Sequence, residues 1–576
     1  MHNKPTSLLL KQSVTLFAFV CGLAHFQFVS AQVPDAGALQ QQLQREVEQN
    51  RPSQPPTPLI KKAPTPSKPV ASKETLEVKK FVVSGATLIS PEQIAQTLAP
   101  FENRELSFDQ IREAANAITA LYTKIGRTAQ AVIPPQDVVN GVIKINILEG
   151  KVGKTIINLD KQEPSRLKSS VVQEFISANN PEGSLIDLNG LERSMALLNE
   201  IPGNESAGEL SAGDKEQSTD ILVSAKDTGF FTGRVDASNY GSPSTGAAQA
   251  IASLNLNNPS GNGDLVSLDA IGSQGSIYGT LKYTIPIGSD GWKVAAGVSA
   301  LDYKSIPSFS PTITQGNAQT YGIYGTYALE RSATSNTNVV VNYENKNYLN
   351  STNGIESSRY QLNDLTIGLN GNRNFSQQYL NWGVNAVLGT LNIGNTNQYN
   401  NDQAGAATNG SFAKLSFNGA LTSALPIDRT NATVSIYGQL ANKNLNSAEQ
   451  LYLGGPYGVR AYPVAQGGGA QGAIASVEIN HTYENQLQLG AFFDAGVIQQ
   501  YISTWNGWQG QTNAGNTYPL YATGLIAKYS IDKVQLSATL ALRVGNNPLY
   551  NSSGQQVNVD NYYRTTQGWI KGTFFF

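Results

Sequence analysis

The sequence predicts a transmembrane β-barrel of about 350 C-terminal residues, preceded by two small α+β domains, a linker and a short N-terminal helix. The first residues look like an export signal, and no later apolar run approaches the roughly 20 residues of a membrane-spanning helix. From residue 228 onward the chain is poor in charge, rich in Gly, Asn, Ser, Thr and Tyr, and alternates apolar with polar residues. Because only helices and closed barrels satisfy all backbone groups inside a bilayer, we expect this region to cross with strands.

Residues 1–31 are typical of a cleavable export signal, with Lys4 and Lys11 before an apolar run from residue 14 to 23 and small residues up to Ala31. The alternative is an ordinary buried helix. Cleavage would move the net charge from −2 to about −4 and leave His481 as the one histidine. It would also remove the histidines and the cysteine of this segment, which are His2, His25 and Cys21. The remaining composition argues against disulfides, thiol nucleophiles, metal sites built from Cys or His, and nucleic-acid binding.

Two short segments come after the signal. Residues 32–50 predict a helix with one narrow apolar stripe, formed by Leu39, Leu43 and Val47 at four-residue spacing among glutamines. Residues 51–75 contain PSQPPTP and APTPSKP, a composition that favours an extended linker. The helix is therefore expected to be tethered at a distance from the α+β domains.

Residues 76–150 predict a first α+β domain in the order strand, helix, helix, strand, strand. The first strand reads LEVKKFVVSG, and the last two read TAQAVIP and GVIKINILEG. Ser90 with Gln93, and Ser107 with Gln110, have the spacing of capping boxes that start helices. Gly126 is a plausible stop for the second helix. The expected apolar face of that helix comprises Phe108, Ile111, Ala115, Ile118, Leu121 and Tyr122.

Residues 151–227 repeat this layout and predict a second copy of the domain. A strand at KTIINL precedes a helix containing Leu167, Val171 and Phe175. A second helix, which Pro202 and Gly203 end, is followed by strands at SAGELSA and TDILVSA. GKVGKT in this region resembles a phosphate-binding loop only in part, since Leu148 occupies the position of its first glycine. Nucleotide binding is therefore not expected.

Residues 228–576 predict the barrel. In SIYGTLKYTIPI, Ile277, Leu281, Ile285 and their odd-numbered neighbours are apolar, whereas the even positions are mostly polar. A soluble sandwich would alternate in the same way. Polar turns such as NPSGNGD, aromatics near strand ends and the export signal favour a barrel with its apolar face toward lipid and its polar face lining a lumen. The chain ends GWIKGTFFF, with Phe574 and Phe576 on one face, as in the closing strand of outer-membrane barrels.

Two charged residues lie in stretches otherwise poor in charge. Arg460 belongs to GGPYGVRAYP, a glycine-rich stretch that we predict to be a loop, and Asp494 belongs to GAFFDAG. Along the second stretch the apolar face includes Phe493 and Val497, so Asp494 is expected to point into the lumen. A guanidinium and a carboxylate form strong paired hydrogen bonds. The alternative is that the two side chains face water in separate places.

The α+β segments resemble tandem POTRA domains, and PPQDVVNGVIKINILEG and LLNEIPGNESAGELSAGDKEQSTDILV are similar to the two POTRA domains of two-partner secretion transporters. The hairpins in NYGSPSTGAAQAIASLNLNNPSGNGD and KYTIPIGSDGWKVAAGVSALDYKS resemble the opening of the barrel in haemolysin secretion and activation transporters, known as TpsB. The resemblance implies about sixteen antiparallel strands. It also implies that an inserted loop meets a barrel strand, through a tip of Val459, Arg460, Ala461 and Tyr462 and an inward strand motif of Phe492, Asp494 and Gly496. Ala461 stands where the family has glycine.

The resemblance further implies a Gram-negative outer-membrane transporter with periplasmic POTRA domains, whose N-terminal helix plugs the resting barrel. The expected partners are a large secreted TpsA-type exoprotein of haemolysin or adhesin type, outer-membrane lipid, and the barrel-assembly machinery during biogenesis. No cofactor, nucleotide or nucleic acid is implied. Alternatives are an insertase of outer-membrane proteins and a passive solute porin. We find no catalytic constellation, because lone His481 lacks a patterned nucleophile.

Overall fold

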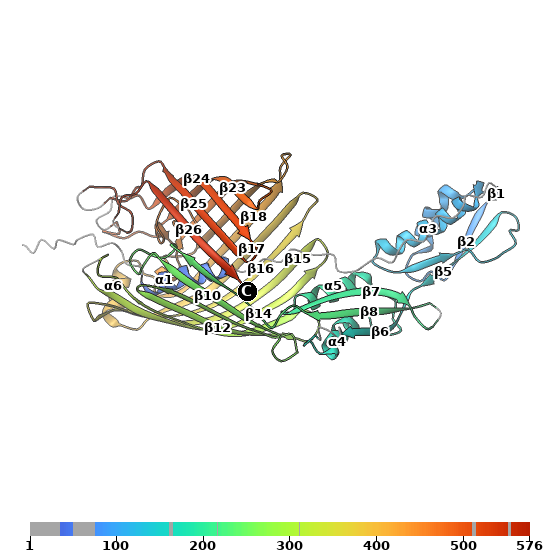
Figure 1. The fold of residues 1–576 in the computed structure, drawn as a ribbon, viewed down its shortest axis with the longest axis horizontal. Helices are drawn as coiled ribbons and strands as arrows, with labels where there is room; N and C mark the ends of the chain where they lie inside the picture. Colours follow the sequence, from blue (N-terminus) through green and yellow to red (C-terminus); the bar gives the residue numbers. More distant parts are fainter. Residues whose placement is uncertain are drawn as a thin grey trace, which may run out of the picture.

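The computed structural model describes residues 35–49, 75–159, 165–215, 217–309, 312–509, 514–550, 554–560 and 562–576. The predicted export signal and, except for Thr75, the predicted linker lie outside these ranges. Figure 1 shows a large barrel with two small α+β domains extending from one end, and helix α1 (Ala36–Gln49) inside the barrel. In the part of the chain that is described, no helix has the length and apolar character to span a bilayer.

The first α+β domain packs two helices on a three-stranded sheet. Its elements are β1 (Thr75–Val78), β2 (Lys80–Ser84), α2 (Pro91–Leu98), η1 (Ala99–Phe101), β3 (Arg104–Ser107), α3 (Phe108–Lys124), β4 (Ala129–Val132) and β5 (Val142–Glu149). The sheet order is β2-β5-β4, with β2 parallel to β5. The predicted first strand is in fact two: β1 leaves this sheet to pair with β3, which the sequence did not predict. The break lies at Lys79 and Lys80, whose amides both donate to the carbonyl of Gly141.

Both predicted capping boxes are present. The hydroxyls of Ser90 and Ser107 accept from the backbone amides of Gln93 and Gln110, whose side chains accept from the amides of the two serines. Gly126, at a φ of +72°, follows the end of α3. One residue of the predicted apolar face is wrong: Phe108, the first residue of α3, is 53% exposed.

The second α+β domain repeats the first. It comprises β6 (Lys151–Leu159), α4 (Ser169–Asn179), α5 (Leu188–Asn199), β7 (Asn204–Ala212) and β8 (Ser218–Asp227). The sheet order β6-β8-β7, with β6 parallel to β8 and β7 antiparallel to it, is the arrangement of the first domain. Leu167 is buried as predicted, but it precedes α4.

Sixteen strands within the described ranges close into one antiparallel barrel, in which β26 pairs with β9. The strands are β9 (Phe231–Ser238), β10 (Gln249–Asn257), β11 (Leu265–Ser273), β12 (Ser276–Ile287), β13 (Trp292–Lys304), β14 (Thr314–Arg331), β15 (Ser335–Thr352), β16 (Ile355–Asn374), β17 (Gln378–Ile393), β18 (Gly410–Ala424), β19 (Thr430–Ala441), β22 (Gln471–Thr482), β23 (Leu487–Gln499), β24 (Thr517–Ile531), β25 (Val534–Val544) and β26 (Thr566–Phe575). A short helix, α6 (Thr396–Ala404), lies between β17 and β18.

The strands present the faces expected from their alternation. Ile277, Leu281 and Ile287 on β12 are exposed on the outer surface, whereas Tyr278 between them is buried. On β23 the outward side chains Phe493 and Val497 are exposed, and Asp494 is fully buried. The outer band of aliphatic and aromatic side chains suits contact with lipid.

The lumen is less polar than expected. Inward side chains of β10 to β18 form an apolar patch against α1, in a cluster with Leu39, Leu43 and Val47 of the helix. The barrel residues of this patch include Ile251, Ile271, Tyr278, Leu301, Tyr303, Tyr348, Tyr360, Leu362, Val387, Leu391 and Phe412. These positions are apolar because they face the apolar stripe of a helix and are shielded from lumen water.

Candidate functional site: the inserted loop and the helix in the barrel

The chain between β19 and β22 folds back into the barrel. This inserted loop, residues 442–470, contains η2 (Ser447–Glu449), β20 (Leu451–Tyr452) and β21 (Gly468–Gly469), and β20 pairs with β21. Its residues share a buried cluster with the inward side chains of β22 to β25, including Ile474, Phe492 and Leu520. The loop therefore fills part of the lumen as a packed element.

The tip of the loop is a tight turn. The amide of Val459 donates to the carbonyl of Leu453 at 2.7 Å, and the amide of Tyr462 donates to the carbonyl of Val459 at 3.1 Å. Val459, Ala461 and Tyr462 are almost completely buried. Ala461 is not among the residues with positive φ, so this turn does not require glycine at that position.

Arg460 and Asp494 are in direct contact. Arg460 Nε donates to Asp494 Oδ2 at 2.9 Å, and Nη2 donates to Oδ1 at 2.7 Å. The backbone amide of Arg460 adds a third hydrogen bond to Oδ2, at 3.1 Å. The carboxylate is fully buried, so its charge is balanced by the guanidinium and not by water. These hydrogen bonds hold both the Arg460 side chain and the backbone of the tip against β23.

Further partners of Arg460 were not anticipated from the sequence. Its Nη1 donates to Glu478 Oε2 at 3.1 Å, and its Nη2 donates to Ser476 Oγ at 2.9 Å. The indole Nε1 of Trp569 donates to the Arg460 carbonyl at 2.8 Å. Ser476 and Glu478 occupy alternate, inward positions of β22. The two-residue period of the strand, together with an acid in a charge-poor segment, could have indicated Glu478 as a further inward partner.

The two other residues of the strand motif shape the space around the tip. The Phe492 ring lies under the guanidinium, 3.5 Å from its central carbon to the ring centre. At Gly496 a side chain would begin only 2.8 Å from Val459 Cγ2, so glycine is needed for the loop to approach. Phe492, Asp494 and Gly496 thus all face the tip.

A second ion cluster holds the part of the loop at η2 (Ser447–Glu449), which we call the limb. Glu449 accepts from Lys346 Nζ at 3.1 Å and from Lys414 Nζ at 2.7 Å, and all three side chains are largely buried. Lys346 also contacts Asp364 at 2.7 Å and Glu344 at 3.3 Å. The sequence did not predict this cluster, because its members come from β15, β16, β18 and the loop.

Helix α1 lies against this limb and the barrel wall. Ser447 Oγ donates to Asp35 Oδ2 at 2.5 Å, and the Ala36 amide donates to Asn350 Oδ1 at 2.8 Å. Gln40 donates from Nε2 to Thr320 Oγ1 at 2.8 Å. A side chain at Gly37 would begin 2.6 Å from Ala448 Cβ, which shows how closely helix and loop pack.

The chain end takes part in closing the barrel. The Phe576 amide and carbonyl exchange hydrogen bonds with Gly233, each at 3.0 Å. Phe574 and Phe576 lie on the outer surface with their ring centres 6.4 Å apart. The two rings therefore sit next to the seam between β26 and β9.

The second α+β domain docks on one rim of the barrel. Glu200, just after α5, accepts from Lys293 Nζ at 2.8 Å and pairs with Arg331. Arg193 Nη2 donates to the Ala328 carbonyl at 2.6 Å. Burial opposes ionisation of Glu200, but the two cations outweigh it and lower the pKa of this carboxyl. This junction defines the rim of the barrel that carries the second α+β domain.

The sequence predicts no chemistry for GKVGKT or His481, and both belong to strands or their starts. GKVGKT enters strand β6, so its glycines form no loop around a phosphate. His481 lies on β22, with Nδ1 2.8 Å from Thr430 Oγ1.

Comparisons with known proteins agree with this architecture. Residues 217–517 match the family described as haemolysin secretion/activation protein ShlB/FhaC/HecB, and residues 76–150 match the ShlB-type POTRA domain. The chain is 25% identical to the heme/hemopexin transporter protein HuxB of Haemophilus influenzae over 424 residues, 71% of this chain and 73% of HuxB. It is 26% identical to the outer membrane transporter CdiB of Escherichia coli over 461 residues, 74% of this chain and 73% of CdiB.

Solved structures show the same fold. CdiB from Escherichia coli superposes with a TM-score of 0.72 at 21% identity, covering 94% of this chain and 99% of that one. CdiB from Acinetobacter baumannii gives a TM-score of 0.64 at 16% identity, with 94% and 100% covered. The family match extends over more than half of the sequence. The chain therefore belongs to the haemolysin secretion/activation family of outer-membrane transporters, with its POTRA domains in the periplasm.

Proposed function

We propose that this chain exports a large secreted protein of haemolysin or adhesin type from the periplasm to the cell surface. The observation that carries the proposal is a barrel whose lumen is occupied by two segments of the same chain, the inserted loop and α1, and whose rim is docked to a POTRA domain. A lumen filled by segments of the chain itself, one of them a separate helix, suits a channel that opens for a polymer.

The POTRA domains are the proposed receptors for the exported partner. In the first domain β2 and β4 are the edges of the sheet, and in the second β6 and β7 are the edges. An unfolded chain in extended conformation can add to such an edge through main-chain hydrogen bonds. Val82 on β2 and Ile156 on β6 are exposed and would contact its apolar side chains.

Export through this barrel requires α1 to leave the lumen. We propose that α1 plugs the resting barrel and that the linker lets it withdraw toward the periplasm. The exported chain then folds outside, which prevents its return, and no cofactor or nucleotide takes part. The further expected partners are outer-membrane lipid and, during biogenesis, the barrel-assembly machinery.

The family supports secretion over the rival role of outer-membrane protein insertase. A passive solute porin would use the barrel alone and leave the POTRA domains without a role. We therefore propose that removing residues 76–226 abolishes secretion of the exported partner while a conducting barrel remains. Secretion is measured as partner in the culture medium, and conductance in planar bilayers. Undiminished secretion by the shortened chain would refute the proposal.

A further inference from the structure

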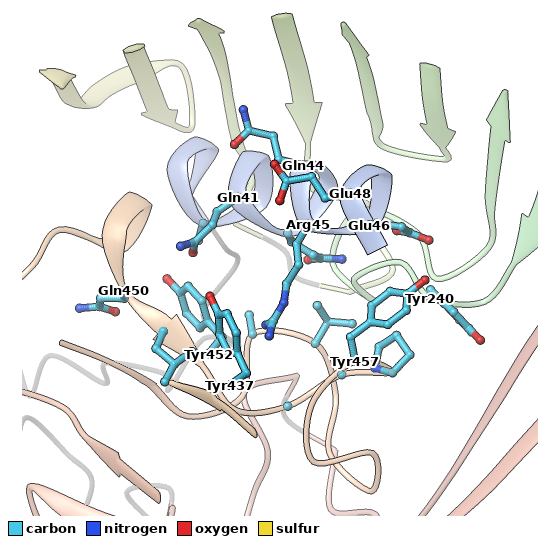
Figure 2. A pocket seen from close by; sticks show the side chains of 18 residues that line it. Gln41, Gln44, Arg45, Glu46, Glu48, Tyr240, Tyr437, Gln450, Tyr452 and Tyr457 are labelled. Atoms are coloured by element: carbon cyan, nitrogen blue, oxygen red, sulfur yellow. The ribbon is translucent and has the colours of Figure 1, made fainter. Parts of the chain in front are cut away.

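The lumen contains a pocket walled by tyrosines beside α1. A cavity of about 230 Å³ lies between α1, the barrel wall and the inserted loop. Figure 2 shows Arg45 extending from α1 into it, with Tyr437 and Tyr452 on one side and Tyr240 and Tyr457 on the other. The guanidinium carbon of Arg45 lies 4.3 Å from the centre of the Tyr437 ring. We call the four tyrosines the tyrosine pocket.

Contacts within the barrel wall and the inserted loop position the walls of the tyrosine pocket. Tyr437 projects inward from β19, and Tyr452 donates its hydroxyl to the Ser447 carbonyl at 3.0 Å. Tyr240 makes edge contacts, at 5.8 Å between ring centres, with both Tyr457 and Trp569. Trp569 is in turn bonded to the carbonyl of Arg460. The pocket is thus continuous with the loop tip and would persist after α1 departs.

The chemistry of the pocket selects a flat cation. Aromatic faces carry negative partial charge and attract a guanidinium, which also stacks on them. The acidic residues that border the cavity, Glu46 and Glu48, are on α1 itself and leave with it. The lining residues that remain are uncharged: the tyrosines, Gln450, and loop residues such as Leu451 and Val464. Recognition would therefore rest on the rings.

We propose that the tyrosine pocket is a guanidinium-binding site of the lumen, occupied by Arg45 while α1 is in the barrel and open to arginine side chains of the exported chain once α1 has left. The second half rests on the proposed function. The first half concerns the closed barrel alone. Arg45 then acts as a latch, and the exported chain displaces it with the same chemical group.

The latch is tested by single-channel recording of the purified full-length protein. R45Q and Y437A should each raise the ratio of open to closed time about tenfold, which corresponds to about 1.4 kcal/mol, within the range for a partly desolvated cation over an aromatic ring. Y437F keeps the ring and should stay within about twofold of the wild type. R45K keeps the charge without the planar group and should fall between. Heat-modifiable migration on gels verifies folding of each variant. An open ratio for R45Q and Y437A equal to that of the wild type would overturn the proposal.

Binding by the vacated pocket is tested with argininamide as the probe. In R45Q channels, millimolar argininamide should reduce the current, whereas citrulline amide, which has the same α-amino group but a neutral isosteric side chain, should not. In R45Q/Y437A channels the same argininamide should lose this effect. Equal reduction with and without Tyr437, or none in R45Q, would overturn the site. Secretion of the partner by these variants is measured separately, so intact secretion with no block leaves the proposed function standing and removes only this inference.

Discussion

Two ion clusters anchor the inserted loop, one at its tip and one at its limb. The signs of the charges are reversed between them. At the tip, one loop cation, Arg460, lies between two wall acids, Asp494 and Glu478. On the limb, one loop anion, Glu449, lies between two wall lysines, Lys346 and Lys414. The guanidinium is a rigid fork that specifies direction, whereas lysine ammonium groups are point charges on flexible stems. The tip thus fixes the loop geometrically, and the limb holds it with more freedom.

The difference matters because the start of α1 packs on the limb. Ser447 and Ala448, next to Glu449, contact the start of the helix. If the limb shifts while the tip stays fixed, the helix can leave and the loop keeps its place in the barrel. Substitutions at the two anchors should therefore differ both in size and in kind.

The largest effect is expected at the tip. Arg460→Ala leaves the fully buried Asp494 without its cation and should lower the free energy of unfolding by about 3–5 kcal/mol. Urea unfolding in detergent measures the loss, and secretion should cease. Arg460→Lys, which keeps charge but loses the fork, is the matched control and should be intermediate. A wild-type unfolding midpoint for Arg460→Ala would contradict the role of the pair.

Exchange of the pair sharpens this test. In R460E/D494R the new glutamate would face Glu478, whose Oε2 lies 3.1 Å from the present guanidinium. We therefore expect R460E/D494R to remain defective and the triple variant with E478Q to recover secretion in part. Recovery without E478Q would show that Glu478 has no influence on the tip.

A smaller effect is expected on the limb. Glu449→Gln removes the carboxylate partner of Lys414, but Lys346 keeps Asp364 at 2.7 Å. Loss of hydrogen bonds to charged groups should cost about 1.5–3 kcal/mol. The open fraction of the channel should rise, because α1 packs on this segment. Glu356→Gln, which breaks the exposed pair with Arg359, is the control and should change neither quantity measurably. An effect as large as that of Arg460→Ala would erase the distinction between the anchors.

The POTRA–barrel junction offers a third one-against-two cluster, this time outside the membrane. The lowered pKa of Glu200 means that its stabilising contribution is complete above the ordinary carboxyl pKa of 4.5 and is lost as pH falls through the lower folded-state value. Glu200→Gln should lower the free energy of unfolding by about 1–2 kcal/mol at pH 7. This difference from the wild type should disappear at acidic pH. Unfolding of wild type and variant from pH 7 to pH 3 checks this. Parallel curves over the whole range would contradict it.

The smallest effect is expected at the contact between limb and helix. Ser447→Ala removes the hydroxyl that donates to Asp35 and should cost about 0.5–1.5 kcal/mol, seen as a few-fold rise in channel opening. Ser447→Thr retains the hydroxyl and should behave as the wild type. Equal opening for Ala and Thr variants would show that the limb does not retain α1 through this bond.

The tip was within reach of the sequence and the limb was not, for a physical reason. Arg460 and Asp494 belong to short stretches in which neighbouring residues indicate a loop and an inward strand face, and the family resemblance implied that the two meet. Glu449 meets lysines from strands far away in sequence, and no local pattern marks that meeting. Local signals also located the helices that start after Ser90 and Ser107, because capping depends on adjacent residues. They failed where packing decides, as at exposed Phe108 and at the division of the first strand into β1 and β2.

The apolar patch inside the barrel has a consequence for how the protein rests. When α1 leaves, Leu39, Leu43 and Val47 and the wall that covers them meet water, and each such side chain contributes about 1.5–3 kcal/mol when buried. In the proposed mechanism the vacant pore is therefore less stable than the plugged one, and the exported chain would hold it open. Once the exported chain has passed, the proposed tether would keep the helix nearby, and its return to the barrel would be favourable. A transporter built in this way resets itself without an external energy source and limits leakage to the time of passage.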